Sequence, residues 1–191
     1  MRRALLLVVL AGLAAGCVST GPVQIGQQPT CTSPAGTVRR GLMIMAQAVP
    51  GAQWLPCIRA LPPGWSFAEI RPRDGRAELF FNSDRDGVHA LVVALEPSCD
   101  VTGTTEVPSE QPEMRRYERV TRVSTGYAGE RHYTFAGGCV TYRFDLRGGT
   151  RGEPVAAAAE SLAFLSRRNL DQMVREVSDG RLRLDPSGDL P

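Results

Sequence analysis

The sequence predicts an α+β fold, with an antiparallel sheet of about five to seven strands and two C-terminal helices packed on one face of it. Between Trp65 and Leu146, apolar and polar residues alternate in short runs separated by turn residues, which is typical of half-buried antiparallel strands. After Val155, apolar residues recur at helical spacing. Because the strands precede the helices rather than alternating with them, a single α+β domain over residues 39–185 is expected.

The first residues have the pattern of an export signal, which we expect to occupy residues 1–16. Arg2 and Arg3 precede an apolar run of twelve residues, and small residues stand directly before Cys17. At 1.5 Å per residue this run reaches about 18 Å, short of the roughly 30 Å of a bilayer core, so a spanning helix is not expected.

The stretch Leu13 to Cys17 (LAAGC) resembles the lipobox of bacterial lipoproteins. The resemblance implies a lipid on the Cys17 thiol and a protein anchored at the extracytoplasmic face of the cell membrane. Ala14 departs from the larger aliphatic residue that the lipobox prefers. The same bond also suits the general signal peptidase, so an unlipidated N-terminus is the alternative.

The next segments lead from the membrane to the sheet. Residues 17–38 are rich in Gly, Pro, Ser, Thr and Gln, which predicts a flexible tether. The apolar run Leu42 to Val49 predicts a short helix or a covered strand. Trp54 to Pro63 carries three prolines and is expected to be irregular.

The predicted sheet starts with a hairpin. Trp65 to Arg71 and Arg76 to Asn82 alternate on either side of a PRDG turn. The NSDRDG stretch from Asn82 to Gly87 resembles the start of a calcium loop, but Val93 stands where a bidentate Glu is needed, so a plain turn is favoured. Val88 to Glu96 is apolar on both faces, which predicts a central strand.

Two polar segments in the middle of the chain are candidate contact surfaces. Asp100 to Glu113 is a long polar loop, which is either a contact surface or a mobile acidic connector. Arg115 to Val123 carries arginines on both faces of a predicted strand. These arginines form either a strip that contacts an anionic wall or lipid component, or a charged edge strand that resists edge-to-edge pairing. The candidates are Arg115, Arg116, Arg119 and Arg122.

The clearest local pattern is a hairpin around Gly137 and Gly138, a two-residue loop suited to a type I′ turn. In the expected register one face holds the pairs Phe135–Val140 and Tyr133–Tyr142, and the other holds Thr134–Thr141 and His132–Arg143. Cys139 then points away from the aromatic face.

The C-terminal part predicts two helices. Pro154 suits the first position of a helix over Val155 to Leu165. Asn169 is expected to cap a second helix that Gly180 ends. Arg181 to Asp185 is a candidate short strand, and residues 186–191 are expected to form a disordered tail.

The cysteine count supports an exported protein. Five cysteines are present, and a lipid on one of them leaves an even set suited to two disulfides outside the cytoplasm. Three pairings are possible, and we favour Cys31 with Cys57 and Cys99 with Cys139. The first bond would attach the second half of the tether to the domain and leave Val18 to Thr30 free. Neither a CxxC motif nor a histidine-rich partner occurs, so no metal site is expected.

Charge argues against a nucleic-acid partner. The net charge of +2 comes from Arg2 and Arg3, because their removal leaves 20 basic against 20 acidic residues. No motif marks a nucleotide, haem or flavin site, so no cofactor is expected.

The residues favour a non-enzymatic binding module of the cell envelope. We assign no catalytic residue, since there is no GxSxG elbow and the cysteines are expected to be oxidised. The alternative is an envelope hydrolase that uses His89 or His132, the only two histidines, as its base. The expected partners are the membrane, through the lipid anchor, and an envelope protein or an anionic wall or lipid component.

Four further motifs resemble a group of uncharacterised secreted or lipid-anchored proteins of high-GC Gram-positive (actinobacterial) type. They are LPPGWSF (Leu61 to Phe67), SDRDG (Ser83 to Gly87), EVPS (Glu106 to Ser109) and GGCVTYRFDL (Gly137 to Leu146). The resemblance implies an envelope location and carries over neither an activity nor a catalytic residue.

Overall fold

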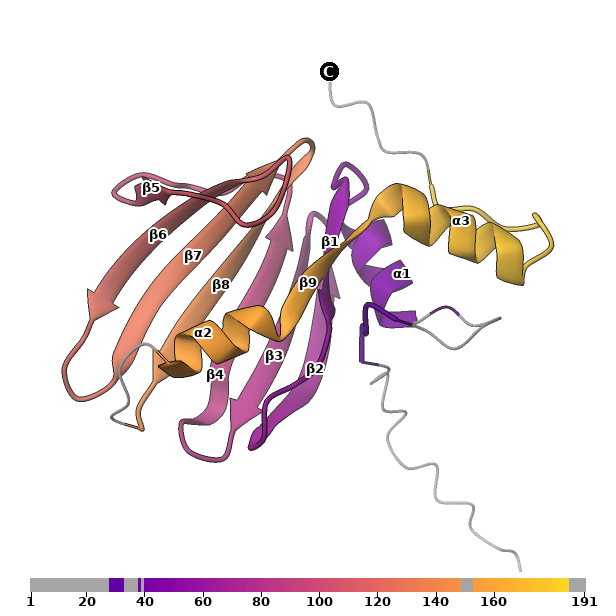
Figure 1. Ribbon diagram of the computed structural model, residues 1–191. Coiled ribbons are helices and arrows are strands. Elements are labelled where there is room, and N and C mark those ends of the chain that lie inside the picture. The colour runs from indigo at the N-terminus through magenta and orange to yellow at the C-terminus, as the bar shows by residue number, and fades with distance from the viewer. Residues whose placement is uncertain (1–27, 33–37, 39, 149–152, 186–191) are drawn as a thin grey trace, which may run out of the picture.

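The computed structural model describes residues 28–32, 38, 40–148 and 153–185 (Figure 1). The predicted signal peptide with Cys17, most of the predicted tether and the predicted tail lie outside the described residues. None of the helices in the described ranges has the length and apolar character needed to cross a bilayer.

The main element is an antiparallel sheet of seven strands (Figure 1). Most consecutive strands are neighbours in the sheet and are joined by hairpins. The exception is the connection from β4, in the middle of the sheet, to β5, which lies at the edge opposite β2. This arrangement confirms the predicted antiparallel sheet and the central place of the Val88 to Glu96 strand. In spatial order the strands are β2 (Trp65–Arg73), β3 (Arg76–Ser83), β4 (Gly87–Glu96), β8 (Gly138–Leu146), β7 (Tyr127–Phe135), β6 (Arg115–Arg122) and β5 (Thr105–Val107).

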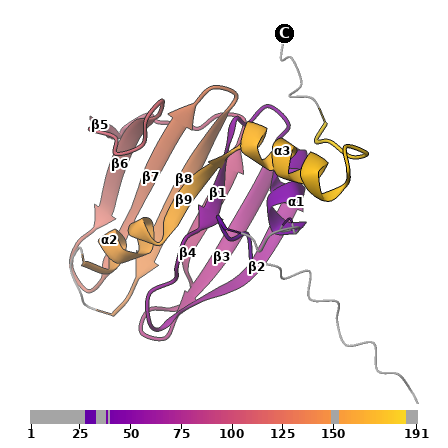
Figure 2. The same cartoon turned by 45° about the vertical axis from the view of Figure 1, so that its right-hand side comes forward.

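A second sheet of two strands lies across one face of the large sheet (Figures 1 and 2). It pairs β1 (Trp54–Ile58) antiparallel with β9 (Leu162–Ser166). Two predictions are therefore wrong, because Trp54 to Pro63 is not wholly irregular and the helix expected over Val155 to Leu165 ends early. Pairing across more than a hundred residues buries Leu55 and Leu162, and this tertiary gain overrides local propensity.

Three helices lie among the described residues. The Leu42 to Val49 run forms α1 (Arg40–Ala48), with Leu42 and Met45 fully buried. The two C-terminal helices are α2 (Glu153–Glu160) and α3 (Arg167–Val177). Both contact β9, and α3 also contacts α1. The predicted sheet with accompanying helices is confirmed, whereas direct packing of both C-terminal helices on one face of the large sheet stays a prediction.

The start of α3 differs from the prediction. Its cap is Ser166, whose hydroxyl accepts the Asn169 N–H at 3.1 Å, so Asn169 lies in the first turn. The segment Arg181 to Asp185 forms no strand and instead lies against α3, where the Leu184 N–H donates to Asp171 Oδ1 at 2.8 Å.

The hydrophobic core lies between the two sheets. We call the face of the large sheet that is turned toward β1 and β9 the inner face, and the opposite face the outer face. The inner face carries fully buried residues from the central strands. Cross-strand partners on the inner face include Leu79 with Val93, Leu91 with Phe144, and Tyr133 with Val140.

The N-terminal segment is attached to the small sheet. Cys31 is bonded to Cys57, and the Ile58 N–H donates to the Pro29 carbonyl at 2.8 Å. Thr30 also bridges to Ile58. The predicted disulfide is thus confirmed, whereas the expectation that Pro29 and Thr30 are free is wrong because β1 offers them a strand partner.

Candidate functional site

The β7–β8 hairpin has a different register from the one predicted. Phe135 pairs with Gly138 and Tyr133 with Val140, so the turn is Ala136–Gly137 and each residue faces a partner two positions from the expected one. Gly137 has φ of 73° while Ala136 has a negative φ, which excludes the expected type I′ turn. The aromatic face is unchanged, because a shift of two residues keeps every side chain on its side.

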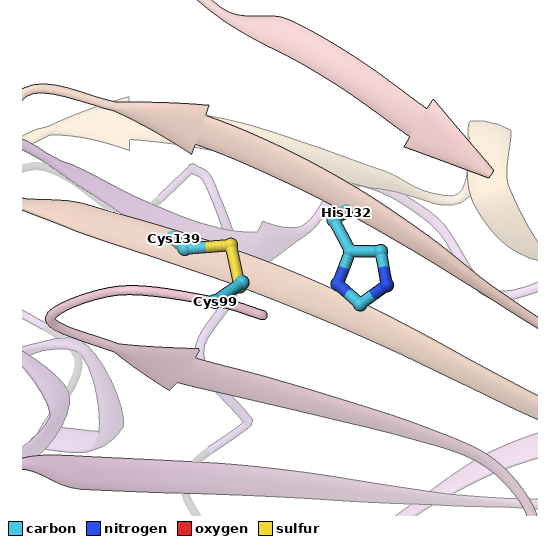
Figure 3. A group of neighbouring side chains, drawn as sticks. All are labelled: Cys99, His132 and Cys139. Carbon is cyan, nitrogen blue, oxygen red and sulfur yellow. A yellow bond between two sulfur atoms is a disulfide. The ribbon is translucent and has the colours of Figure 1, made fainter. Parts of the chain in front are cut away.

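The observed register brings together a polar cluster on the outer face. His132 faces Thr141 rather than Arg143, and Thr134 faces Cys139. His132 Nδ1 lies 3.0 Å from Thr141 Oγ1, which in turn lies 3.1 Å from Cys99 Sγ. The predicted Cys99–Cys139 disulfide is confirmed and lies beside the imidazole (Figure 3).

His132 is a buried imidazole with its two nitrogens in different surroundings. Its exposed fraction is 4%, and burial lowers its pKa below the usual 6.5 although nearby Glu130 acts in the opposite direction. The Nε2 atom lies 3.7 Å from Glu130 Oε2 and has no hydrogen-bond partner among the described residues. We therefore expect a neutral imidazole near pH 7.

This burial predicts a pH-dependent stability. As pH falls below 6.5 the unfolded chain takes up a proton at His132 before the folded chain does, so the free energy of unfolding decreases. Urea titrations from pH 8 to about pH 5 should show a smaller decrease for His132→Gln than for the parent. The control is His89→Gln, which removes the only other histidine. Equal pH slopes for the parent and His132→Gln would contradict the prediction.

The cluster has the order hydroxyl, imidazole, carboxylate, but it offers no accessible nucleophile. Thr141 is 1% exposed and has a disulfide sulfur against its hydroxyl, so a substrate carbonyl has no route to Oγ1. His89 lies on β4, and β8 separates that strand from β7, which carries His132. The His89 ring packs on Phe80, with centroids 4.6 Å apart, and its Nε2 is 3.9 Å from Glu69. The two histidines therefore do not share a site.

All four arginines of the predicted contact strip are paired with carboxylates. Arg115 donates two hydrogen bonds to Glu106, at 2.9 and 2.7 Å. Because a carboxylate lies beside each of these guanidinium groups, the strip presents little net positive charge to an external anion. The other pairs are Arg116 with Glu110 and Glu118, Arg119 with Glu130, and Arg122 with Asp145.

The edge-strand interpretation holds for half of β6. The predicted loop Asp100 to Glu113 contains β5, which pairs only with Arg116–Glu118 of β6. The remaining half, Arg119 to Arg122, has no strand on its outer side among the described residues. Charged side chains there discourage pairing with another chain.

The NSDRDG stretch is a structural turn. Asp86 is 5% exposed, and its Oδ2 accepts the Ser83 hydroxyl at 2.9 Å. Its Oδ1 accepts the Gly148 N–H at 2.7 Å. Both carboxylate oxygens therefore bind the protein itself and tie this turn to the end of β8.

A cleft of about 680 Å³, which the sequence did not indicate, lies at the start of α3. Its walls come from the start of β1, the first half of α3, the segment Arg183 to Asp185, and Glu113. Trp54 supplies a half-buried aromatic surface. Arg168 and Arg183 are exposed and make no ion pair within the part of the chain that the structure describes. The cleft thus combines an indole with two guanidinium groups and with the carboxylates of Glu113 and Asp185, and none of these four charged groups forms an ion pair among the described residues.

A buried arginine fixes the walls of this cleft. Arg167, 8% exposed, donates to the Ala46 carbonyl at 2.6 Å and to the Asp185 carbonyl at 2.8 Å, which joins α3 to α1 and to the C-terminal segment. Asp171 pairs with Arg175 at 2.6 Å as well as accepting the Leu184 N–H. These contacts join the segments that form the walls of the cleft, which is thus formed without a ligand, as is usual for binding sites.

Comparison with protein-family models, with curated proteins and with solved structures finds no match for this chain. The resemblances to the lipobox and to actinobacterial envelope proteins accordingly stay predictions.

Proposed function

We propose that this protein is a lipid-anchored, extracytoplasmic binding protein whose cleft at the start of α3 holds an anionic group of a cell-envelope ligand. The observation that carries the proposal is the contrast between two sets of arginines. The predicted strip is balanced by carboxylates, whereas Arg168 and Arg183 line a cleft in which neither forms an ion pair among the described residues, although Glu113 and Asp185 also line it. A carboxylate or phosphate group would complete their hydrogen bonds.

Two further features support the binding role. Trp54 offers a flat apolar surface at the same cleft, which suits a ligand that carries a sugar ring or an aliphatic part next to its anion. The two disulfides suit an oxidising compartment, and they agree with export through the predicted signal peptide. In this proposal α2 and α3 pack on the same face of the large sheet, as the sequence predicts, and α3 presents the cleft.

The anchor makes a prediction of its own. Cells that produce the parent chain should yield a membrane-bound form whose intact mass includes a diacylglycerol at Cys17, whereas Cys17→Ala should appear in the soluble fraction or as an uncleaved precursor. The measurement is fractionation followed by mass spectrometry. An unmodified soluble parent protein, or unchanged membrane retention of Cys17→Ala, would contradict lipidation and leave the cleft to be tested separately.

The cleft is tested by fluorescence. Only Trp54 and Trp65 are present, so a Trp65→Phe chain reports on the cleft alone. The probes are a soluble wall glycopeptide with free carboxylates and glycerol 3-phosphate as a phospholipid headgroup. We expect that at least one of these two probes causes a saturable change in the fluorescence emission of Trp54. The double variant Arg168→Ala, Arg183→Ala should weaken binding at least tenfold, because each charged hydrogen bond contributes about 1.5 to 3 kcal/mol.

A matched control separates the cleft from general charge. Arg59 and Arg73 are also exposed and form no ion pair among the described residues, but neither lines the cleft. The variant Arg59→Ala, Arg73→Ala removes the same charge and should bind as the Trp65→Phe parent does. If both double variants lose the same affinity for the probe, the effect is due to net charge alone, which would contradict the proposal.

A further inference from the structure

Three separate segments bring metal-ligating side chains together on the outer face. His132 comes from β7, Cys139 from β8, and Cys99 from the loop after β4 (Figure 3). One donor atom from each residue lies within 4.8 Å of the other two. Cys139 and His132 are 1% and 4% exposed, while Cys99 is half-buried. The donors therefore converge at a largely buried position rather than on open surface.

While the disulfide is intact, neither sulfur is a thiolate and no metal site exists. A dithiol reductant changes this by transferring two electrons and two protons: the Sγ–Sγ bond breaks, two protein thiols form, and the reductant becomes a disulfide. Loss of the two thiol protons to solvent then leaves two thiolates beside a neutral imidazole. Two thiolates and one imidazole form a donor set suited to Zn²⁺.

We propose that reduction of the Cys99–Cys139 disulfide by a dithiol creates a zinc site, with Cys99, Cys139 and His132 as ligands and a fourth position open to water. Tetrahedral coordination with Zn–S bonds of about 2.3 Å separates the two sulfurs by about 3.8 Å, against about 2 Å in a disulfide. Cys99 lies in a loop rather than in a strand, so it is the ligand that moves.

The surroundings of His132 match those of a zinc ligand. Figure 3 shows one nitrogen of the imidazole on the side of the disulfide. This is Nδ1, which lies 3.0 Å from the Thr141 hydroxyl, while Nε2 lies 3.7 Å from Glu130 Oε2. A hydrogen bond from Nε2–H to this carboxylate, which the present separation of 3.7 Å does not make, would orient the ring and raise its basicity once zinc is bound. The Thr141 hydroxyl, 3.1 Å from Cys99 Sγ, is placed to donate to a thiolate. Each polar group around the cluster thus has a role in the reduced state.

The test compares zinc binding by the reduced and oxidised forms of the Cys17→Ala chain. A phosphine reductant opens the disulfides, and Zn²⁺ is titrated in competition with a chromophoric chelator. We expect one equivalent bound after reduction and none before it. The control Cys99→Ser, Cys139→Ser keeps Cys31 and Cys57 and should bind none. His132→Gln should weaken binding at least tenfold, and Glu130→Gln about tenfold.

Several results would overturn the proposal. One is a reduced parent chain that binds no more Zn²⁺ than the double serine variant, or that unfolds on reduction. Another is His132→Gln with unchanged affinity. Should that variant fail to fold, NMR of the parent decides: Zn²⁺ must shift the His132 ring signals and leave those of His89 in place. An unshifted His132 refutes the site, and none of these outcomes bears on the α3 cleft.

Discussion

Replacing Gly137 with alanine is expected to lower the free energy of unfolding by about 3 to 4 kcal/mol. Gly137 has φ of 73°, a conformation that costs an L residue about 1 to 2 kcal/mol. An added Cβ would also lie 1.9 Å from the Gly51 carbonyl oxygen, which is backbone and has no side-chain torsion to relieve the clash. Either the β7–β8 turn or the segment before β1 must therefore shift. Urea unfolding followed by circular dichroism measures the loss.

Gly75 provides the matched control for this substitution. It has almost the same φ, 71°, but a Cβ there would have no heavy atom within 4 Å. Gly75→Ala should therefore cost about 1 to 2 kcal/mol, the backbone contribution alone. If both variants lose the same stability, the close approach of the Gly51 carbonyl contributes nothing.

Arg167→Met is expected to lower the free energy of unfolding by about 3 kcal/mol. The guanidinium donates to two carbonyls from different elements, and hydrogen bonds from a charged donor contribute about 1.5 to 3 kcal/mol each. Burial lowers the pKa of Arg167, with Asp185 and Asp171 opposing that shift. Methionine fills part of the volume but leaves the Ala46 carbonyl without this donor. Chemical denaturation measures the effect.

The neighbouring residue gives a sharp comparison. Arg168 is exposed and forms no ion pair among the described residues, so Arg168→Met should change stability by less than about 0.5 kcal/mol. The same substitution at the two adjacent positions thus separates the structural arginine from the one proposed to contact the ligand. Equal stability losses at both positions would contradict the role given to Arg167.

Local patterns predicted the large sheet because its strands are connected by hairpins. The alternation in Trp65 to Arg71 and Arg76 to Asn82 reflects burial on one face, and turn residues mark where the chain reverses. The same reasoning failed for β1 and β9. Their partners are more than a hundred residues apart, so neither segment carries the signal that stabilises it. The proline in β1 also argued against a strand there, although β1 pairs with β9 in the small sheet.

The cluster around His132 was partly predictable. Cysteine parity indicated two disulfides, and both favoured pairings are present. The partner of His132 was not predictable, because the turn position that sets the register depends on the Gly51 backbone packing against Gly137. A hairpin sequence alone allows turns two residues apart that keep the same side chains on the same face.

By itself, the sequence determined the antiparallel sheet, the pairing of cysteines in disulfides and the balance of charge beyond residues 1–16, since these follow from local periodicity and from counting. Only the tertiary structure decided which charges are used. Arginines on β6 look available in the sequence, yet each lies beside a carboxylate, which comes from β5, β7, β8, the loop before β6 or β6 itself. Arg168 and Arg183, which form no ion pair among the described residues, lie at the α3 cleft. The physical reason is that ion pairing depends on distances of a few ångströms between segments that are far apart in the chain.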